Sequence, residues 1–203
     1  MSNPHHEKLI TPERLAFFSD AVIAITITLL VLDIKVPKVE TASALISALA
    51  GQWTNYLSFV ISFLITGVAW MNHHRMFTYI RKTNNTLLVL NTLFLMWLAL
   101  IPFVTGLMAE YLAKPAASVG AFVYGMTLTV VGVFFNLIWI YLSRNPGLLL
   151  PKVDMREIRF MKRQYSIGFI FYVLATALSL LNASISVGLY ILLIIYSAFS
   201  FKD

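Results

Sequence analysis

Five side chains of this sequence could do chemistry within otherwise apolar surroundings. Ser19 and Asp20 precede one apolar run, and Trp70, His73 and His74 lie at the end of another. A carboxylate beside imidazoles could transfer protons, bind a metal ion or form a catalytic site. Adjacent histidines point about 100° apart around a helix, so His73 and His74 do not easily face one metal. We therefore favour a hydrogen-bond cluster that satisfies Asp20, with proton sensing or gating as the alternative.

The composition is that of an integral membrane protein. Of 203 residues, 59% are hydrophobic and only 12% are charged, whereas soluble domains carry about 25% charged residues. The absence of cysteine excludes disulfides, thiolate chemistry and cysteine-based zinc sites. The net charge of +6 does not indicate nucleic-acid binding, because the basic residues lie in short loops between apolar runs.

The apolar runs predict an all-α protein with a single transmembrane domain covering residues 1–203. A helix needs about 20 apolar residues to cross a bilayer, and none of the runs alternates as membrane strands do. The six expected spans cover about 17–34, 53–77, 87–108, 119–142, 165–181 and 185–201. Residues 151–162, which precede the fifth span, are expected to form a short interfacial helix.

The charges of the loops predict the orientation. Twelve of the 15 lysines and arginines fall on one side of the six-span layout, and only Lys35, Lys38 and Lys114 fall on the other. By the positive-inside rule, both termini are expected to be cytoplasmic in a multi-pass protein of the plasma membrane. A cleaved signal peptide at the first span is disfavoured by Asp20 at its start and by Asp33 just after its apolar core.

The first span carries an apolar stripe. At about 100° per residue, Ile25, Thr28, Leu29 and Leu32 lie along one face of a helix, and Asp20 lies about 140° away from Ile25. The stripe and the carboxylate therefore face different partners. Ordinary helix packing is sufficient to explain such a stripe, and periodicity alone does not decide between packing and a functional surface.

Two motifs indicate a family. The stretch from Arg14 to Asp20 fits the R-x-x-x-F-S-D signature, and "WMNHHRMF" contains Trp70, His73 and His74. Both resemble conserved blocks of the transmembrane-protein-175 family of potassium channels, and the six-span layout is similar over essentially the whole chain. With one copy of the signature, the sequence resembles the single-repeat prokaryotic members.

The resemblance implies a homotetramer in a prokaryotic plasma membrane, with a central pore lined by the first helix. It places a hydrophobic constriction at Ile25, potassium preference at Thr28, with a transient potassium ion near it, and further narrow points at Leu29 and Leu32. It implies no permanent metal, no cofactor and no enzymatic activity. The residues expected to brace the first helix are Arg14, Phe18, Ser19, Asp20, Trp70, His73 and His74.

The expected activity is passive, potassium-selective cation conduction, weakly selective over sodium and gated by the apolar ring. The sequence has no threonine-valine-glycine-tyrosine-glycine loop, so a filter of backbone carbonyls is not expected. The alternative is a proton-coupled secondary transporter that uses Asp20 with His73 and His74. Transporters often contain inverted repeats and broken helices, and no inverted repeat is visible here.

Overall fold

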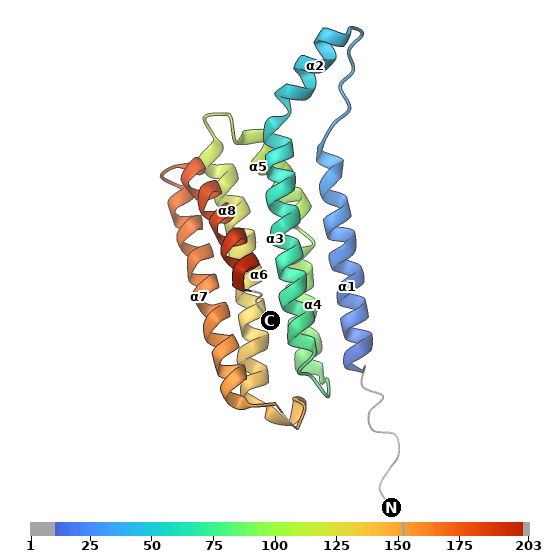
Figure 1. Cartoon of the computed structure of the whole chain (residues 1–203), viewed down its shortest axis with the longest axis vertical. Helices are drawn as coiled ribbons and strands as arrows, with labels where there is room; N and C mark the ends of the chain where they lie inside the picture. Colours follow the sequence, from blue (N-terminus) through green and yellow to red (C-terminus); the bar gives the residue numbers. More distant parts are fainter. Residues whose placement is uncertain (1–10, 152, 201–203) are drawn as a thin grey trace, which may run out of the picture.

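The computed structural model is an all-α bundle of long, roughly parallel helices, described here for residues 11–151 and 153–200 (Figure 1). Side chains are described as far as Tyr196. The helices are α1 (Pro12–Leu29), α2 (Ala42–Gly51), α3 (Trp53–Phe77), α4 (Asn85–Leu98), α5 (Ile101–Tyr111), α6 (Ala117–Arg144), α7 (Met155–Ser179) and α8 (Ala183–Ser200), with short 3₁₀ turns η1 (Leu30–Asp33) and η2 (Pro146–Leu148). Lys8, Lys152 and Lys202, used above for the orientation, lie outside the described residues, as does residue 201 of the last expected span.

Local sequence explains where the helices begin. Thr11, Asn84 and Asp154 cap α1, α4 and α7 by accepting hydrogen bonds from backbone N–H groups of the first turn. Such caps satisfy donors that would otherwise lack a partner. Each cap comes directly before an apolar or amphipathic run, so the starting points of these helices follow from the sequence.

Four helical segments within the described residues are long and apolar enough to cross a membrane: Pro12–Asp33, Trp53–Phe77, Asn85–Tyr111 and Ala117–Arg144. The α7 helix has 25 residues, and its first turns carry several charges. Ala183–Tyr196 of α8 is a shorter apolar stretch. Figure 1 shows α7 and α8 lying alongside the other long helices, so the bundle has the layout of a multi-pass membrane protein.

The structure differs from the sequence-based expectation at two places. The expected third span is divided into α4 and α5, because Pro102 has no N–H to donate to the carbonyl of Leu98. The expected interfacial helix over 151–162 is not separate, because α7 runs without interruption from Met155 to Ser179. No proline separates the two parts, and Gly168 is tolerated within the helix.

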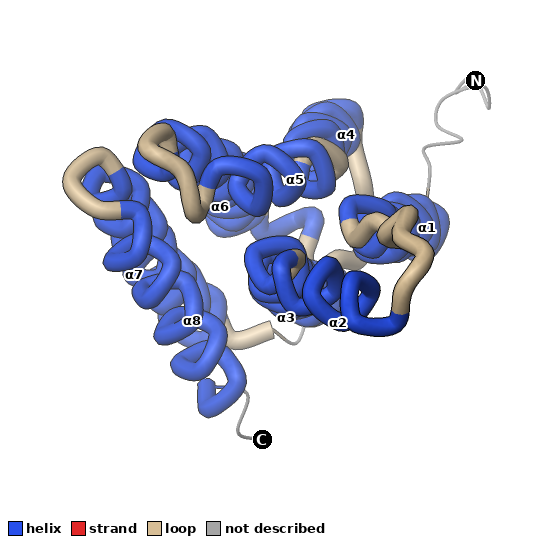
Figure 2. The backbone as a smooth tube through the Cα atoms, turned by 90° about the horizontal axis from the view of Figure 1, so that it is seen from above, coloured by secondary structure: helices blue, strands red, loops and turns tan. Residues whose placement is uncertain are grey.

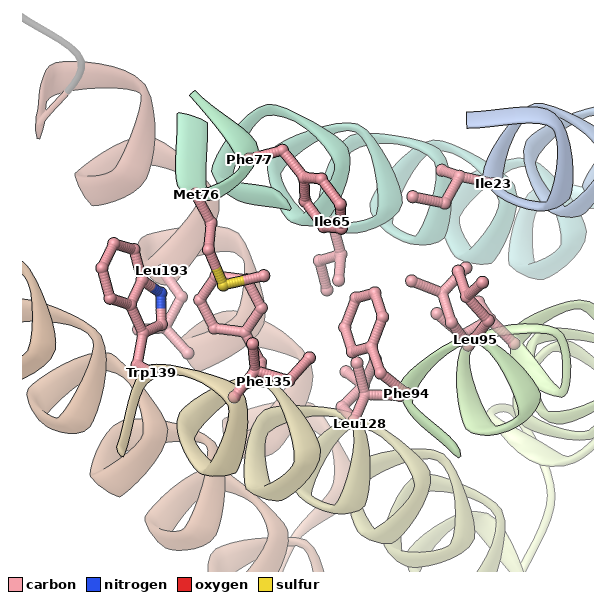
Figure 3. Packing of buried hydrophobic residues seen from close by; sticks show 14 of the residues in the cluster. Ile23, Ile65, Met76, Phe77, Phe94, Leu95, Leu128, Phe135, Trp139 and Leu193 are labelled. Carbon is pink, nitrogen blue, oxygen red and sulfur yellow. The ribbon is translucent and has the colours of Figure 1, made fainter. Parts of the chain in front are cut away.

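The core lies around α6, which packs against α4, α5, α7 and α8. Phe94 of α4 lies beside Leu128 and Phe135 of α6, with Ile65 of α3 directed into the same interior (Figure 3). Seen from above, α1 lies at one end of the bundle and α7 at the opposite end (Figure 2). The first helix is therefore a peripheral element of the single chain, held mainly by α3 and α4.

Two connecting segments meet at the end of the bundle where α1 begins. Ile80 and Leu149 form an isolated antiparallel bridge, and the backbone N–H of Arg81 donates to the carbonyl of Leu148 at 2.8 Å. The Tyr79 hydroxyl donates to the Glu157 carboxylate at 2.8 Å. The segment before α4 is thus hydrogen-bonded to the segment before α7 and to the first turn of α7.

Candidate functional site

Asp20 and Trp70 form a direct contact between α1 and α3. The indole Nε1 of Trp70 donates to Asp20 Oδ1 at 2.9 Å. The carboxylate that opens the apolar run is therefore bonded within its own chain, as the hydrogen-bond interpretation of the motif expects. Charge-assisted hydrogen bonds are stronger than neutral ones, and this one links α1 to α3.

Ser19, Asn91 and His73 form a second, fully buried connection. Asn91 Nδ2 lies 2.9 Å from Ser19 Oγ, and Asn91 Oδ1 lies 2.9 Å from His73 Nε2. The three residues have exposed fractions of 0%, 0% and 1%. One amide of α4 therefore joins α1 to α3, and Asn91 is the functional residue that sequence reasoning missed.

The hydrogen bonds of this triad determine its protonation. Ser19 Oγ donates to the carbonyl of Leu15 at 2.8 Å, so it must accept from Asn91 Nδ2. The amide oxygen of Asn91 then faces His73, and since this oxygen only accepts, His73 Nε2 must carry a proton. The His73 ring also stacks on Phe94, with ring centroids 5.4 Å apart. His73 is fixed as a donor inside the bundle.

His74 points elsewhere. Its side chain is exposed, and its ring lies 5.8 Å from that of Trp70, whereas His73 is buried against Phe94. Within the described part of the chain, no group of three His, Cys, Asp or Glu residues could hold a metal ion. The two histidines therefore point in different directions, as expected for adjacent residues that lie about 100° apart around a helix.

Arg14 and Phe18 stand apart from these contacts. Both side chains are exposed on α1, and Phe18 has an exposed fraction of 54%. Asp20 is bonded to Trp70 rather than to Arg14. The structure thus brings together Ser19, Asp20, Trp70 and His73, and the bracing role expected of Arg14 and Phe18 stays a prediction.

The other end of the first helix is held by contacts that the sequence does not indicate. The Gln52 amide accepts from the backbone N–H of Lys35 at 2.9 Å and donates to the Lys35 carbonyl at 2.8 Å. Asn55 Nδ2 donates to the carbonyl of Asp33 at 3.0 Å. Both amides belong to the α2–α3 region, so α1 and η1 are attached at both ends.

The apolar stripe of α1 faces away from the chain. Ile25, Leu29 and Leu32 have exposed fractions of 59%, 42% and 61%, and Thr28 is also exposed. The opposite face is buried, with Ile23 and Thr26 at 1% and 2%. The exposed stripe and the contact of Asp20 with Trp70 of α3 therefore lie on different faces of α1, and the role of the stripe stays a prediction.

The stripe begins on the α-helix α1 and ends in the 3₁₀ turn η1. Thr28 Oγ1 donates to the carbonyl of Ile25 at 2.9 Å, and this exposed hydroxyl oxygen keeps its capacity to accept. Leu29 is the last residue of α1, and Leu32 lies in the 3₁₀ turn η1. A 3₁₀ turn has fewer residues per turn than an α-helix, so the ideal α-helical count does not apply to Leu32, although its side chain stays exposed.

The fold and the site define a multi-pass membrane protein whose first helix is anchored by polar contacts and presents an apolar, threonine-containing face outward. A family model described as "Endosomal/lysosomal potassium channel TMEM175" matches residues 14–102. The match covers the anchored helix, the Trp-His block and Asn91. Two bacterial relatives, 38% and 41% identical over 92% and 91% of this chain, extend the match to nearly the whole sequence, and the chain belongs to the TMEM175 family.

Two bacterial relatives match over most of their length. A potassium channel of Streptomyces collinus is 38% identical over 188 residues, covering 92% of this chain and 91% of that protein. A potassium channel of Chamaesiphon minutus is 41% identical over 187 residues, covering 91% and 92%. The crystal structure of a lysosomal potassium-selective channel TMEM175 homolog from Chamaesiphon minutus superposes with a TM-score of 0.85 at 36% identity, covering 95% of this chain and 98% of that one.

Animal relatives are longer. The human endosomal/lysosomal proton channel TMEM175 is 29% identical over 162 residues, which make up 31% of its length. The chain therefore matches the bacterial relatives along nearly their whole length and the human protein along less than a third.

Proposed function

We propose that this protein is a potassium channel formed by four copies of the chain, each a single channel domain. The observation that carries the proposal is the division of α1 into two faces. Asp20 and Ser19 are bonded inward, while Ile25, Thr28 and Leu29 face out of the bundle. One helix does not enclose a water path, so a pore along this face requires symmetry copies.

Ile25 forms the gate in this proposal. Copies of Ile25 around a symmetry axis make an apolar ring, and a ring narrower than a hydrated ion closes a pore by dewetting. Leu29 and Leu32 extend the apolar lining on the same face. Rotation or tilt of α1 changes the width of the ring, and the anchors at Asp20 and Ser19 limit that movement.

Thr28 provides the preference for potassium over sodium. Its exposed hydroxyl donates its hydrogen to the carbonyl of Ile25, so the oxygen still has lone pairs that can coordinate a passing ion. A single layer of hydroxyls replaces only part of a hydration shell. The preference for potassium is therefore weak, and a potassium ion stays only transiently near Thr28.

The protein lies in the plasma membrane with both ends of the chain in the cytoplasm. Figure 1 shows the α3–α4 and α6–α7 connections at the end of the bundle where α1 begins. Arg81 lies in the first connection and Arg144 at the end of α6, while Arg156, Arg159 and Arg163 lie in the first turns of α7. The positive-inside rule therefore predicts that this end is cytoplasmic. The outer end carries Lys35, Lys38 and Lys114.

The experiment is reconstitution of the purified protein into planar bilayers or liposomes with a potassium gradient. The proposal predicts discrete unitary currents that reverse near the potassium equilibrium potential, with a smaller permeability for sodium. Saturable flux that requires a proton gradient and shows no unitary current would instead support the proton-coupled transporter. Chemical crosslinking of the protein in detergent tests the assembly, which is expected to stop at four copies.

A further inference from the structure

A cavity of about 130 Å³ lies within the bundle, on the side of α3 that faces α7 and α8. Its described lining residues come from α3 to α8, and none of them belongs to α1. Figure 2 shows the pair α7–α8 on the far side of the bundle from α1. The cavity is therefore separate from the face proposed to line the pore.

The part of the cavity at mid-bundle depth is apolar. Ile65 and Leu128 line it from α3 and α6, and Phe169 lines it from α7. Ile65, Phe94 and Leu128 point into the same interior in Figure 3. A hydrocarbon chain in this part of the cavity would contact apolar side chains, as it contacts apolar lipid tails in the bilayer core.

The other end of the cavity is polar and carries a guanidinium. Asn72 and Arg75 lie in the last turns of α3, and Gln164 lies in the first half of α7. Asn136 of α6 completes this end, and its amide is oriented by bonds to the carbonyl of Gly132 at 2.9 Å and from Ser166 at 3.1 Å. The polar side chains come from α3, α6 and α7 and line the same end of the cavity.

This polar end lies toward the positively charged end of the bundle. Arg159, Lys162 and Arg163 lie on the turns of α7 that precede Gln164. An anionic group would be attracted to this region, and a cation would be repelled. The cavity therefore suits an anionic amphiphile whose apolar chain lies in the apolar part and whose charged group lies at the polar end. Such a molecule would come from the leaflet next to the basic end of the bundle.

We propose that the cavity binds an anionic phospholipid, with one acyl chain beside Ile65, Leu128 and Phe169 and the phosphate at Arg75. Arg75 also interacts with Tyr165, and a guanidinium with five N–H donors can bind a phosphate in addition to the partners that it already has. The site is independent of conduction, so its test stands whether or not the protein forms a potassium pore.

Two glycines supply a matched pair of substitutions. Gly168 lines the cavity, and a Cβ atom added there meets nothing within 4 Å. Gly188 of α8 has equally open surroundings but is not among the described lining residues. Gly168→Leu fills the cavity, whereas Gly188→Leu adds the same side chain elsewhere on the bundle.

The experiment is native mass spectrometry of the detergent-solubilised protein titrated with palmitoyl-oleoyl phosphatidylglycerol or the corresponding phosphatidylcholine. We expect phosphatidylglycerol to bind roughly tenfold more tightly than phosphatidylcholine, since the phosphate–guanidinium bond is charge-assisted and the zwitterionic headgroup weakens it. Gly168→Leu should lower the affinity for phosphatidylglycerol at least about fivefold, and Gly188→Leu should leave it unchanged. Ala69→Leu, on another wall of the cavity, replaces Gly168→Leu if that variant does not fold.

A second pair of variants tests the headgroup. Arg75→Gln should remove the preference for phosphatidylglycerol, while Arg144→Gln, at the same end of the bundle but not among the described lining residues, should retain it. Equal binding of both lipids by the unmodified protein would overturn the proposal. Retention of phosphatidylglycerol by both cavity-filling variants would overturn it as well.

Discussion

The amide of Asn91 lies 2.9 Å from Ser19 Oγ, and thereby links α4 to α1 at a point where neither side chain is exposed. The other end of the same amide accepts from His73 at 2.9 Å. Removing this amide should therefore disturb the position of the first helix as well as the stability of the fold.

For Asn91→Ala we expect a loss of about 2 kcal/mol in stability, since His73 Nε2–H is left buried without an acceptor. Thermal unfolding of the purified protein in detergent measures the effect. Thr92→Val is the control, because Thr92 is exposed on the same helix and donates to the carbonyl of Leu88 within that helix. Equal unfolding midpoints for the two variants would contradict the role assigned to Asn91.

The Trp70–Asp20 bond should hold the rotation of α1. Trp70→Phe keeps an aromatic ring and removes the donor to Asp20 Oδ1. We expect a loss of about 1 to 2 kcal/mol in stability and a changed open probability in single-channel recordings. Trp53→Phe is the control, since Trp53 is also about half exposed, at 52%, and lies at the opposite end of α3. An open probability that is the same in both variants would argue against this anchor.

Thr28 should determine selectivity. Thr28→Ala is expected to lower the preference for potassium over sodium, seen as a shift of the reversal potential under bi-ionic conditions, because it removes the outward hydroxyl layer. Thr26→Val is the comparison, since Thr26 faces the interior and donates to the carbonyl of Val22 at 2.9 Å. An unchanged reversal potential in Thr28→Ala would place the selectivity elsewhere.

Tyr79 should make stability depend on alkaline pH. Burial, together with the hydrogen bond to Glu157, raises the pKa of Tyr79 from 10.0 to about 12. A phenol that keeps its proton longer in the folded state stabilises the fold fully below pH 10, and this contribution is lost as the pH rises from 10 to about 12. The difference in unfolding midpoint between the unmodified protein and Tyr79→Phe should therefore shrink over this range. Parallel pH curves for the two proteins would show that the bond does not contribute.

The membrane class could be predicted from composition, and the angle between Asp20 and the Ile25 stripe from helical periodicity. A hydrogen-bond cluster that satisfies Asp20 was also predicted, and the structure shows that Trp70 is its partner. Asn91 was missed since its partners are distant in the chain, although an amide within an apolar span was itself a signal. The pairing of Ile80 with Leu149 was equally inaccessible, because it depends on how two loops meet after the helices pack. The break at Pro102 was readable from proline chemistry, but the length of the apolar run concealed it.

The proposed gate at Ile25 is tested most directly by single-channel recording of Ile25→Asn. An amide in place of the apolar side chain lets water wet the ring, so we expect a channel that is open most of the time or has an enlarged unitary current. Ile185→Asn is the control, because Ile185 is similarly exposed, at 51%, on α8 rather than on α1. If Ile25→Asn gave the same unitary current and open probability as the unmodified protein and Ile185→Asn, the stripe on the first helix would not line the pore.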